Sequence, residues 1–244
     1  MSPFLNELGD WERQLKLQIR RRYGAMAAGG AFPEGAAARA VAAGYPADWV
    51  GLMPAGLAAS YSGCGFLWQG MTAGEDDLAG QQVVDLGAGA GFDGFIAGQI
   101  FHADALVSVD LTPEMGAVAG RSNPRLWPLA GDIERLPLAD GCADLVIANA
   151  SFNLTVNKDI AFAEAYRILK LGGRLIARDL VKVGELPAEV REDPLSFNTS
   201  LGGAGDEETM EKSLNSAGFS EVQIFGHQPF SYLTSVLISA AKLR

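Results

Sequence analysis

From Gln81 onward, short runs of β-type residues alternate with helical segments. The predicted strands are Gln82–Leu86, Leu106–Asp110, Leu126–Ala130, Asp144–Asn149 and Arg174–Asp179. The helical segments between them are Phe92–Phe101, Pro113–Gly120 and Lys158–Leu169. This alternation is typical of βαβ units, so the sequence predicts an α/β fold around a parallel sheet. A further helix at Asp206–Ala217 and two strands at Glu221–Phe225 and Leu233–Ala240 complete the pattern.

The first eighty residues have a different texture. A helix is predicted to begin at Ser2-Pro3, with an apolar stripe made of Phe4, Leu8, Trp11, Leu15 and Ile19. Gly, Ala and Pro then break the chain into short helices and loops as far as Gly80. We expect residues 1–80 to form a helical cap over the carboxyl edge of the sheet. Residues 81–244 would form the core, with a lid-like insertion at about 184–205.

Charge and composition narrow the class of partner. Twenty-nine acidic and nineteen basic residues give a formal charge of −10, which disfavours a nucleic-acid substrate and favours a small molecule. No run of about 18 apolar residues is present to span a membrane, and the start of the chain lacks a signal-peptide pattern. We therefore expect a cytoplasmic protein. Two cysteines and two histidines without ligand spacing predict no metal site.

A glycine-rich turn follows the first predicted strand directly. It reads Asp85-Leu-Gly87-Ala-Gly89-Ala-Gly91 and opens a helix. This spacing differs from the G-x-G-x-x-G turn that cradles a pyrophosphate. Glycines without side chains allow the backbone to approach a ligand closely, and the acid at the strand end is placed to meet an amino group.

Two further acids end the next two strands. Asp110, followed by Leu111, is placed to accept both hydroxyls of a ribose. Asp132 can accept a hydrogen bond from an adenine amino group, while the backbone N–H of Ile133 faces a ring nitrogen. Since open α/β sheets bind ligands at the carboxyl ends of their strands, these acids and the glycine turn together predict an adenosyl site. One such acid alone would more simply cap the next turn.

These residues resemble the class I S-adenosylmethionine-dependent methyltransferases and, within them, the arsenite methyltransferase family. The matching segments include Tyr23-Gly24-Ala25, Gly63-Cys64-Gly65, the glycine turn, and Val109-Asp110-Leu-Thr-Pro-Glu-Met115. The resemblance implies a Rossmann-like, seven-stranded sheet and S-adenosylmethionine as cofactor. The residues expected to hold this cofactor are Asp85, Gly87, Gly89, Gly91, Asp110, Leu111, Asp132, Ile133 and Asn149.

The substrate site departs from that family. Members bind As(III) through three thiols, as a soft metalloid requires. Cys64 matches the first position, but Ala150 and Ser200 stand at the other two. Cys142 cannot replace them, because it precedes a strand and lies roughly 20 Å from the ligand edge. Arsenite is therefore not the expected substrate.

Candidate acceptor-binding and catalytic residues lie at strand exits, in the lid and in the cap. They are Asn149, Asn153, Asp179, Cys64 and Ser200. Three of them have a simpler structural interpretation. Asn153 could cap the next helix or turn, Asp179 could form an ion pair with Arg178 or Lys182, and Cys64 could be a small core residue. No residue stands out as a general base.

Two hypotheses of function follow. In the first, the protein transfers a methyl group to a small organic molecule, in specialised metabolism. In the second, the fold serves another reaction, such as cyclisation or elimination. A non-catalytic subunit is a third, weaker hypothesis, and the Ala-rich cap leaves a protein partner or a homodimer open.

Overall fold

The computed structural model of the 244-residue chain describes residues 9–29, 32, 34–185, 187 and 203–243. Ser200 and most of the predicted lid-like insertion lie outside these described residues. No helix among the described residues is long and apolar enough to cross a membrane.

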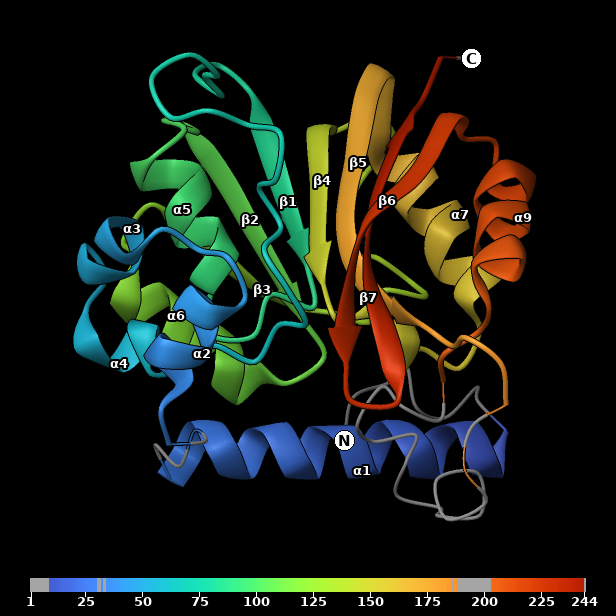
Figure 1. The fold of residues 1–244 in the computed structure, drawn as a ribbon, viewed down its shortest axis with the longest axis horizontal. Coiled ribbons are helices and arrows are strands. Elements are labelled where there is room, and N and C mark those ends of the chain that lie inside the picture. The colour runs from blue at the N-terminus through green and yellow to red at the C-terminus, as the bar shows by residue number, and fades with distance from the viewer. Residues whose placement is uncertain (1–8, 30–31, 33, 186, 188–202, 244) are drawn as a thin grey trace.

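Seven strands form one sheet in the order β3-β2-β1-β4-β5-β7-β6 (Figure 1). They are β1 (Gln82–Leu86), β2 (Ala105–Asp110), β3 (Leu126–Ala130), β4 (Ala143–Asn149), β5 (Leu169–Val181), β6 (Ser220–Phe230) and β7 (Leu233–Ala241). The first five are parallel, whereas β7 runs antiparallel to both β5 and β6. The expected Rossmann-like, seven-stranded α/β class is therefore confirmed.

The helices predicted after the first strand begin within one residue of the positions that the sequence indicates, whereas the predicted helix start at Ser2-Pro3 lies outside the described residues. They are α1 (Asp10–Gly29), α2 (Ala36–Ala42), α3 (Ala47–Gly51), α4 (Ala55–Ala58), α5 (Phe92–Gln99), α6 (Pro113–Ser122), α7 (Lys158–Ile168) and α9 (Glu207–Ala217), with a 3-10 turn η2 (Phe152–Leu154). Asp206 caps α9 by accepting a hydrogen bond from the backbone N–H of Thr209 at 2.8 Å, which satisfies one of the donors exposed at a helix start.

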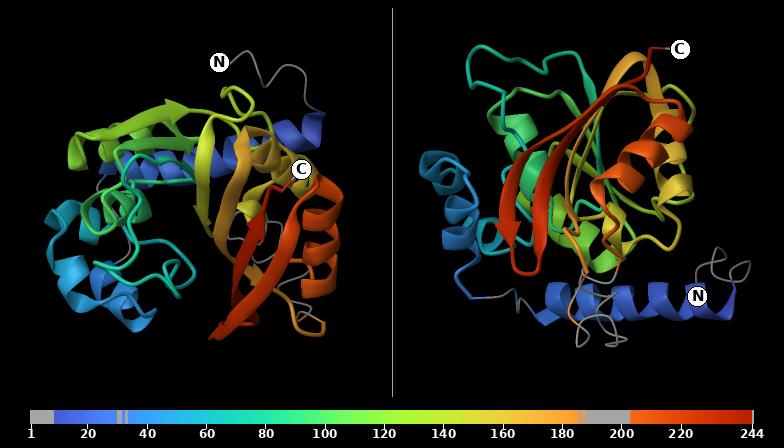
Figure 2. Two further views of the ribbon diagram at one scale, coloured as in Figure 1. Left: turned by 90° about the horizontal axis from the view of Figure 1, so that it is seen from above. Right: turned by 45° about the vertical axis from the view of Figure 1, so that its right-hand side comes forward.

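Two hydrophobic cores lie on opposite faces of the sheet (Figure 2). Side chains of a strand alternate between the two faces. Val83 and Leu145 therefore pack on the α5 side, whereas their neighbours Val84 and Val146 pack on the α7 and α9 side. Because both faces are covered by helices, these central strands are apolar almost throughout.

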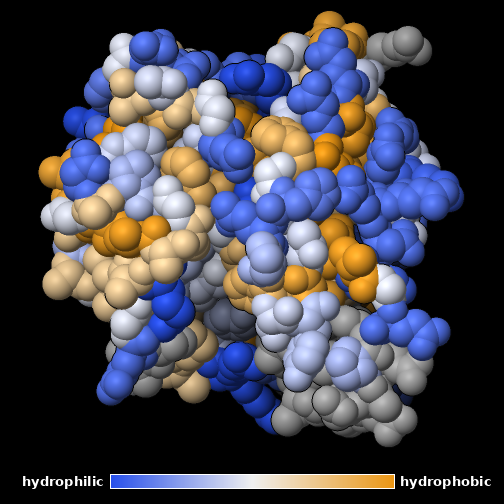
Figure 3. Space-filling view, in the orientation of Figure 1, coloured by the Kyte–Doolittle hydropathy of each residue, from blue (hydrophilic) through white to orange (hydrophobic). Residues whose placement is uncertain are grey.

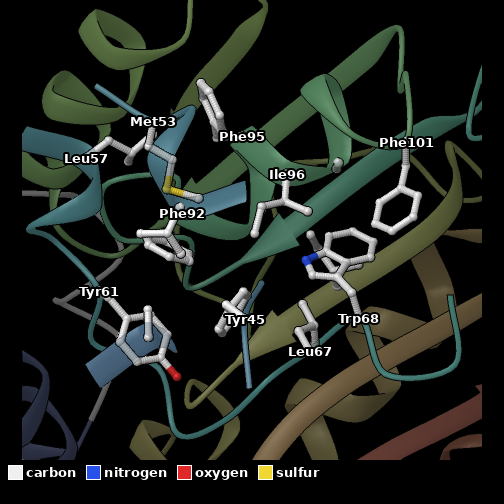
Figure 4. Close-up of a cluster of buried hydrophobic side chains, with 14 of the residues drawn as sticks. Tyr45, Met53, Leu57, Tyr61, Leu67, Trp68, Phe92, Phe95, Ile96 and Phe101 are labelled. Atoms are coloured by element: carbon white, nitrogen blue, oxygen red, sulfur yellow. The ribbon is translucent and has the colours of Figure 1, made fainter. Parts of the chain in front are cut away.

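An aromatic cluster joins the N-terminal segments to α5 (Figure 4). The rings of Tyr45 and Phe92 meet edge to face with centroids 5.2 Å apart, and those of Trp68 and Phe101 lie 4.9 Å apart. This core continues from α2–α4 into the sheet without interruption. The division into a cap of residues 1–80 and a core of residues 81–244 stays a prediction.

Helix α1 lies along the carboxyl edge of the sheet, beneath the arrowheads of β1 and β4 (Figure 1). Its buried residues are Leu15, Lys16 and Ile19. The sequence also placed Trp11 on the buried stripe, and this was wrong, because Trp11 is 57% exposed. The helix therefore buries only a short face, and this face includes a lysine.

Candidate functional site

A pocket with about 710 Å³ of open space lies at the carboxyl edge of the sheet. The loops that follow β1, β2, β3 and β4 form its base, and α1 closes one side. Its lining includes Gly87, Gly89, Asp110, Leu111, Thr112, Asp132, Ile133, Asn149 and Ser151, together with Lys16, Ile19 and Tyr23 of α1. We call it the first pocket. It brings together most of the residues that the sequence assigned to the cofactor.

The glycine turn after β1 adopts a backbone that other residues rarely take. Gly87 and Gly89 have φ of +68° and +54°, in the left-handed region that favours glycine. A Cβ on Gly87 would lie 2.4 Å from the Cβ of Ser151, whereas one on Gly89 would meet nothing within 4 Å. Gly91, with φ of +85°, begins α5. The turn therefore packs tightly against the β4 exit and leaves open space above Gly89.

Asp110 connects the loops that follow β1 and β2. Its Oδ2 accepts a hydrogen bond from the Gly89 N–H and its Oδ1 accepts one from the Thr112 N–H, both at 2.8 Å. Burial raises the pKa of this carboxyl, and the two backbone hydrogen bonds oppose that shift. Each oxygen retains a lone pair, so the carboxylate can accept further hydrogen bonds from a ligand in the pocket.

Asp85, at the end of β1, has a buried oxygen without a partner. The residue is 4% exposed, and its Oδ2 has no hydrogen-bond partner among the described residues. Burial raises the pKa of Asp85 well above its ordinary value, and the carboxyls of Asp93 and Asp110 raise it further. An unpaired buried acceptor is costly. The side chain lines a smaller cavity that continues from the first pocket along Gly87 and Gly89.

Lys16 of α1 binds the acid that follows β3. Its Nζ lies 2.6 Å from Asp132 Oδ2 and also contacts Glu134 Oε2, and its side chain is 3% exposed. Burial lowers the pKa of Lys16, but the two carboxylates outweigh this and leave it raised. The ion pairs hold α1 on the carboxyl edge and explain why this helix buries a lysine. Ile133, beside Asp132, lines the pocket as expected.

Asn149 lies at the centre of a buried network behind the first pocket. Its Nδ2 donates to Asp93 Oδ2 at 3.0 Å and to Tyr45 Oη at 3.0 Å, and its Oδ1 accepts from the Cys64 N–H at 3.0 Å. Tyr45 and Trp68 also donate to Asp93. Burial raises the pKa of Asp93 to about 6, and these three side-chain donors oppose the shift. The amide of Asn149 is thus occupied in positioning the segment around Cys64.

A second, wider pocket with about 1780 Å³ of open space adjoins the first. It lies between α1, α2, the segment around residues 61–64 and the end of β6, and Tyr23, Ser62 and Ala150 line both pockets. Cys64 is part of its lining and is 4% exposed. Burial raises the pKa of the Cys64 thiol, so at neutral pH it is protonated.

Asn153 and Asp179 meet each other, but neither lines these two pockets. Asp179 accepts hydrogen bonds from the N–H groups of Asn153 at 3.1 Å and Leu180 at 2.8 Å, and burial raises its pKa to about 6. Asn153 donates to the Leu180 carbonyl at 2.6 Å. These contacts tie η2 to the end of β5. A catalytic role for either residue stays a prediction, and Ser200 lies outside the described residues.

Sequence reasoning did not identify the residues that reach the pockets from α1 and the segment before β1. Lys16, Tyr23 and Ser62 are the clearest cases. Tyr23 did belong to a motif shared with the methyltransferases, so that signal was available. Lys16 offers no comparable local signal, because its partner Asp132 is 116 residues away.

Cys142 precedes β4 and therefore lies at the opposite end of that strand from Asn149. It lines neither pocket. Within the described part of the chain, no three His, Cys, Asp or Glu side chains gather as metal ligands would.

Two comparisons with known protein sequences are informative. The arsenite methyltransferase of Halobacterium salinarum is 37% identical over 59% of this chain and 39% of its own length. The arsenite methyltransferase of Aquipseudomonas alcaligenes is 32% identical over 74% of this chain and 54% of its own length. The chain thus spans only about two-fifths to one-half of these relatives.

The fold has a close counterpart among solved structures. An arsenic(III) S-adenosylmethionine methyltransferase from Chlamydomonas reinhardtii superposes with a TM-score of 0.66 and 25% identity, over 81% of this chain and 72% of that one. The model of a family described as a methyltransferase domain matches residues 77–218, which contain β1 to β5 and the loops that form the base of the first pocket. On this match, and on the strand order of the sheet, the chain belongs to the methyltransferase domain family.

Proposed function

We propose that this protein binds S-adenosylmethionine in the first pocket and transfers its methyl group to a small organic acceptor in the second pocket. The observation that carries the proposal is the convergence of the glycine turn, Asp110 and Asp132 on the first pocket, with Asp85 in the smaller cavity that adjoins it along Gly87 and Gly89. The acidic charge of −10 favours a small acceptor over nucleic acid. A cytoplasmic location and a role in specialised metabolism are part of the proposal.

The residues present fit an adenosyl amino acid. The unpartnered Oδ2 of Asp85 needs a hydrogen-bond donor, which the ammonium of the amino acid would provide. Asp110 retains lone pairs for ribose hydroxyls, and the space above Gly89 allows a ligand to approach the backbone. Asp132 and Ile133 border the adjoining part of the cavity, where an adenine would be recognised.

When bound, S-adenosylmethionine would supply a sulfonium methyl group to an acceptor lone pair, with sulfur retaining the electron pair of the S–CH₃ bond. The protein's contribution is mainly to align donor and acceptor. Asn149 and Asp93 fix the segment at Gly63 and Cys64, next to Ser62, which lines both pockets. A Cβ on Gly63 would lie 2.7 Å from the Asn149 amide, so only glycine permits this contact.

Arsenite is not the proposed acceptor. As(III) requires three thiolates, and at the second pocket Cys64 is accompanied by Ala150 where the arsenite methyltransferases carry a second cysteine. The third of those positions in this chain is Ser200. Of the activity named for these relatives, we therefore propose only methyl transfer for this chain.

The first test is calorimetric titration with S-adenosylhomocysteine. We expect micromolar binding to the intact chain and a loss of at least about thirtyfold in Asp110→Asn, because a charged acceptor of hydrogen bonds contributes roughly 2 kcal/mol. Asp104→Asn is the matched control, since Asp104 precedes the same strand at its other end. An intact chain that does not bind this nucleoside would overturn the proposal.

The second test asks whether a methyl group is transferred. Labelled S-adenosylmethionine is incubated with a broad panel of small acceptors, and the label should appear in an organic product and not in arsenite. Binding of the nucleoside without transfer to any acceptor would favour the alternative, in which the fold serves cyclisation or elimination. Size-exclusion chromatography of the same sample tests the predicted protein partner or homodimer.

A further inference from the structure

We propose that the acceptor carries an anionic group attached to an apolar body, and that Arg22 and Arg39 recognise the anionic group at the mouth of the second pocket. This inference rests on the proposed function, because it assigns the class of molecule that the second pocket holds. It concerns residues that lie outside the cofactor site, since neither arginine lines the first pocket.

The interior of the second pocket is apolar. Cys64 and Leu180 are buried at its base, 4% and 1% exposed, and belong to one hydrophobic cluster against which Ala150 packs. Met26 of α1 and Phe230 of β6 also line it. Such a lining favours an aliphatic or aromatic body, because burial of apolar surface supplies the binding energy.

The mouth of the pocket is positively charged. Arg22 of α1 and Arg39 of α2 both line it and are exposed to solvent. No Asp or Glu is found among the described residues that line this pocket. Arg39 is held in place by a hydrogen bond from its Nη1 to the backbone oxygen of Glu34. Two guanidinium groups therefore lie at this pocket, although the chain as a whole has a charge of −10.

The surface view agrees with this arrangement. In Figure 3 the surface over α2–α4 is largely apolar, and a hollow separates it from the β6–β7 hairpin above α1. A planar guanidinium binds a carboxylate through paired hydrogen bonds and repels a cation. An acceptor with its apolar part inward and its anion between the two arginines would satisfy both parts of the pocket.

The test uses pairs of probes that differ only in charge. The intact chain is saturated with S-adenosylhomocysteine and titrated with benzoate, 2-naphthoate and dodecanoate, and with the corresponding primary amides. We expect at least one carboxylate to bind at least tenfold more tightly than its amide, and its affinity to fall with added salt. Equal affinities within every pair, tighter binding of the amides, or no binding of any carboxylate would overturn the inference.

Matched variants locate the effect. The double variant Arg22→Gln/Arg39→Gln should bind the carboxylate no better than the amide. The double variant Arg20→Gln/Arg21→Gln removes the same two charges from residues that do not line the pocket, and it should change the ratio less than twofold. All variants must retain their thermal midpoint and their affinity for S-adenosylhomocysteine. If the nucleoside binds but the carboxylate preference is missing, only this inference fails. If the nucleoside does not bind, the proposed function fails.

Discussion

The two pockets are built in different ways. The first is formed by loops that follow the parallel strands, and its acids Asp110 and Asp132 accept hydrogen bonds from backbone N–H groups. The second is enclosed by α1, α2, the segment around residues 61–64 and the end of β6, and its charges stand exposed at the mouth. On the proposed function, the sheet topology provides the cofactor site, while peripheral segments provide the acceptor site.

The largest expected effect concerns the glycine turn of the first pocket. Gly87→Ala adds a Cβ 2.4 Å from that of Ser151 to a residue with φ of +68°. We expect a loss of about 3 kcal/mol in the free energy of unfolding and of more than a hundredfold in nucleoside affinity. Gly172→Ala is the control, because it has φ of +83° but no atom within 4 Å, and it should cost only about 1 kcal/mol. Equal losses in the two variants would show that the collision with Ser151 is unimportant.

The next effect concerns the link between the pockets, since α1 carries both Lys16 and Arg22. Lys16→Met leaves the carboxylates of Asp132 and Glu134 without their cation. We expect a loss of about 2 kcal/mol in the free energy of unfolding and a severalfold loss of nucleoside affinity. The first value is low for a buried ion pair, because both carboxylates retain some exposure. Denaturant unfolding measures the first and calorimetry the second. The control Lys212→Met, on the exposed face of α9, should change neither quantity. If Lys16→Met also leaves both quantities unchanged, α1 does not contribute to the cofactor site.

A third effect concerns the buried network between the pockets and depends on pH. Burial raises the pKa of Asp93 to about 6, above the value of about 3.9 in an unfolded chain. The folded state binds this proton more tightly, so the contribution of Asp93 to stability is complete below about pH 4 and is lost as the pH rises through 6.

Asp93→Asn does not titrate, so it isolates this contribution. The stability of the intact chain relative to the variant should fall by about 1 kcal/mol between pH 5 and pH 7. Unfolding by urea at several pH values measures the difference. A difference that stays constant or grows with pH would contradict the assignment.

The smallest effect concerns the remaining thiol of the second pocket. Cys64→Ala removes one buried sulfur atom, and we expect a loss of about 1 kcal/mol or less in stability and a change of less than threefold in carboxylate affinity. Cys142→Ala, away from both pockets, is the control. A complete loss of methyl transfer in Cys64→Ala alone would show that this thiol takes part in the chemistry.

The sequence located most elements closely because their signals are local. Strands β1 and β3 agree with the prediction to the residue, and α5, α6 and α7 begin where predicted. The prediction failed at glycines inside strands. Strand β5 begins at Leu169 and not at Arg174, and β6 continues past Gly226 to Phe230. Gly172 and Gly226 have positive φ, as in a turn, but each strand continues past its glycine. The pairing of both strands with their neighbours shows a register shift. Locally, a glycine in a turn and one in a bulge look alike.

What the sequence by itself determined is the α/β fold, its carboxyl edge and the residues that gather there, because parallel strands bring their ends together whatever else surrounds them. Only the tertiary structure decided the partners of those residues. Lys16 with Asp132 and Asn149 with Asp93 are pairs separated by 116 and 56 positions. The structure also brought Arg22 and Arg39 to one cavity. The physical reason is that packing between distant segments has no period along the chain, whereas secondary structure does.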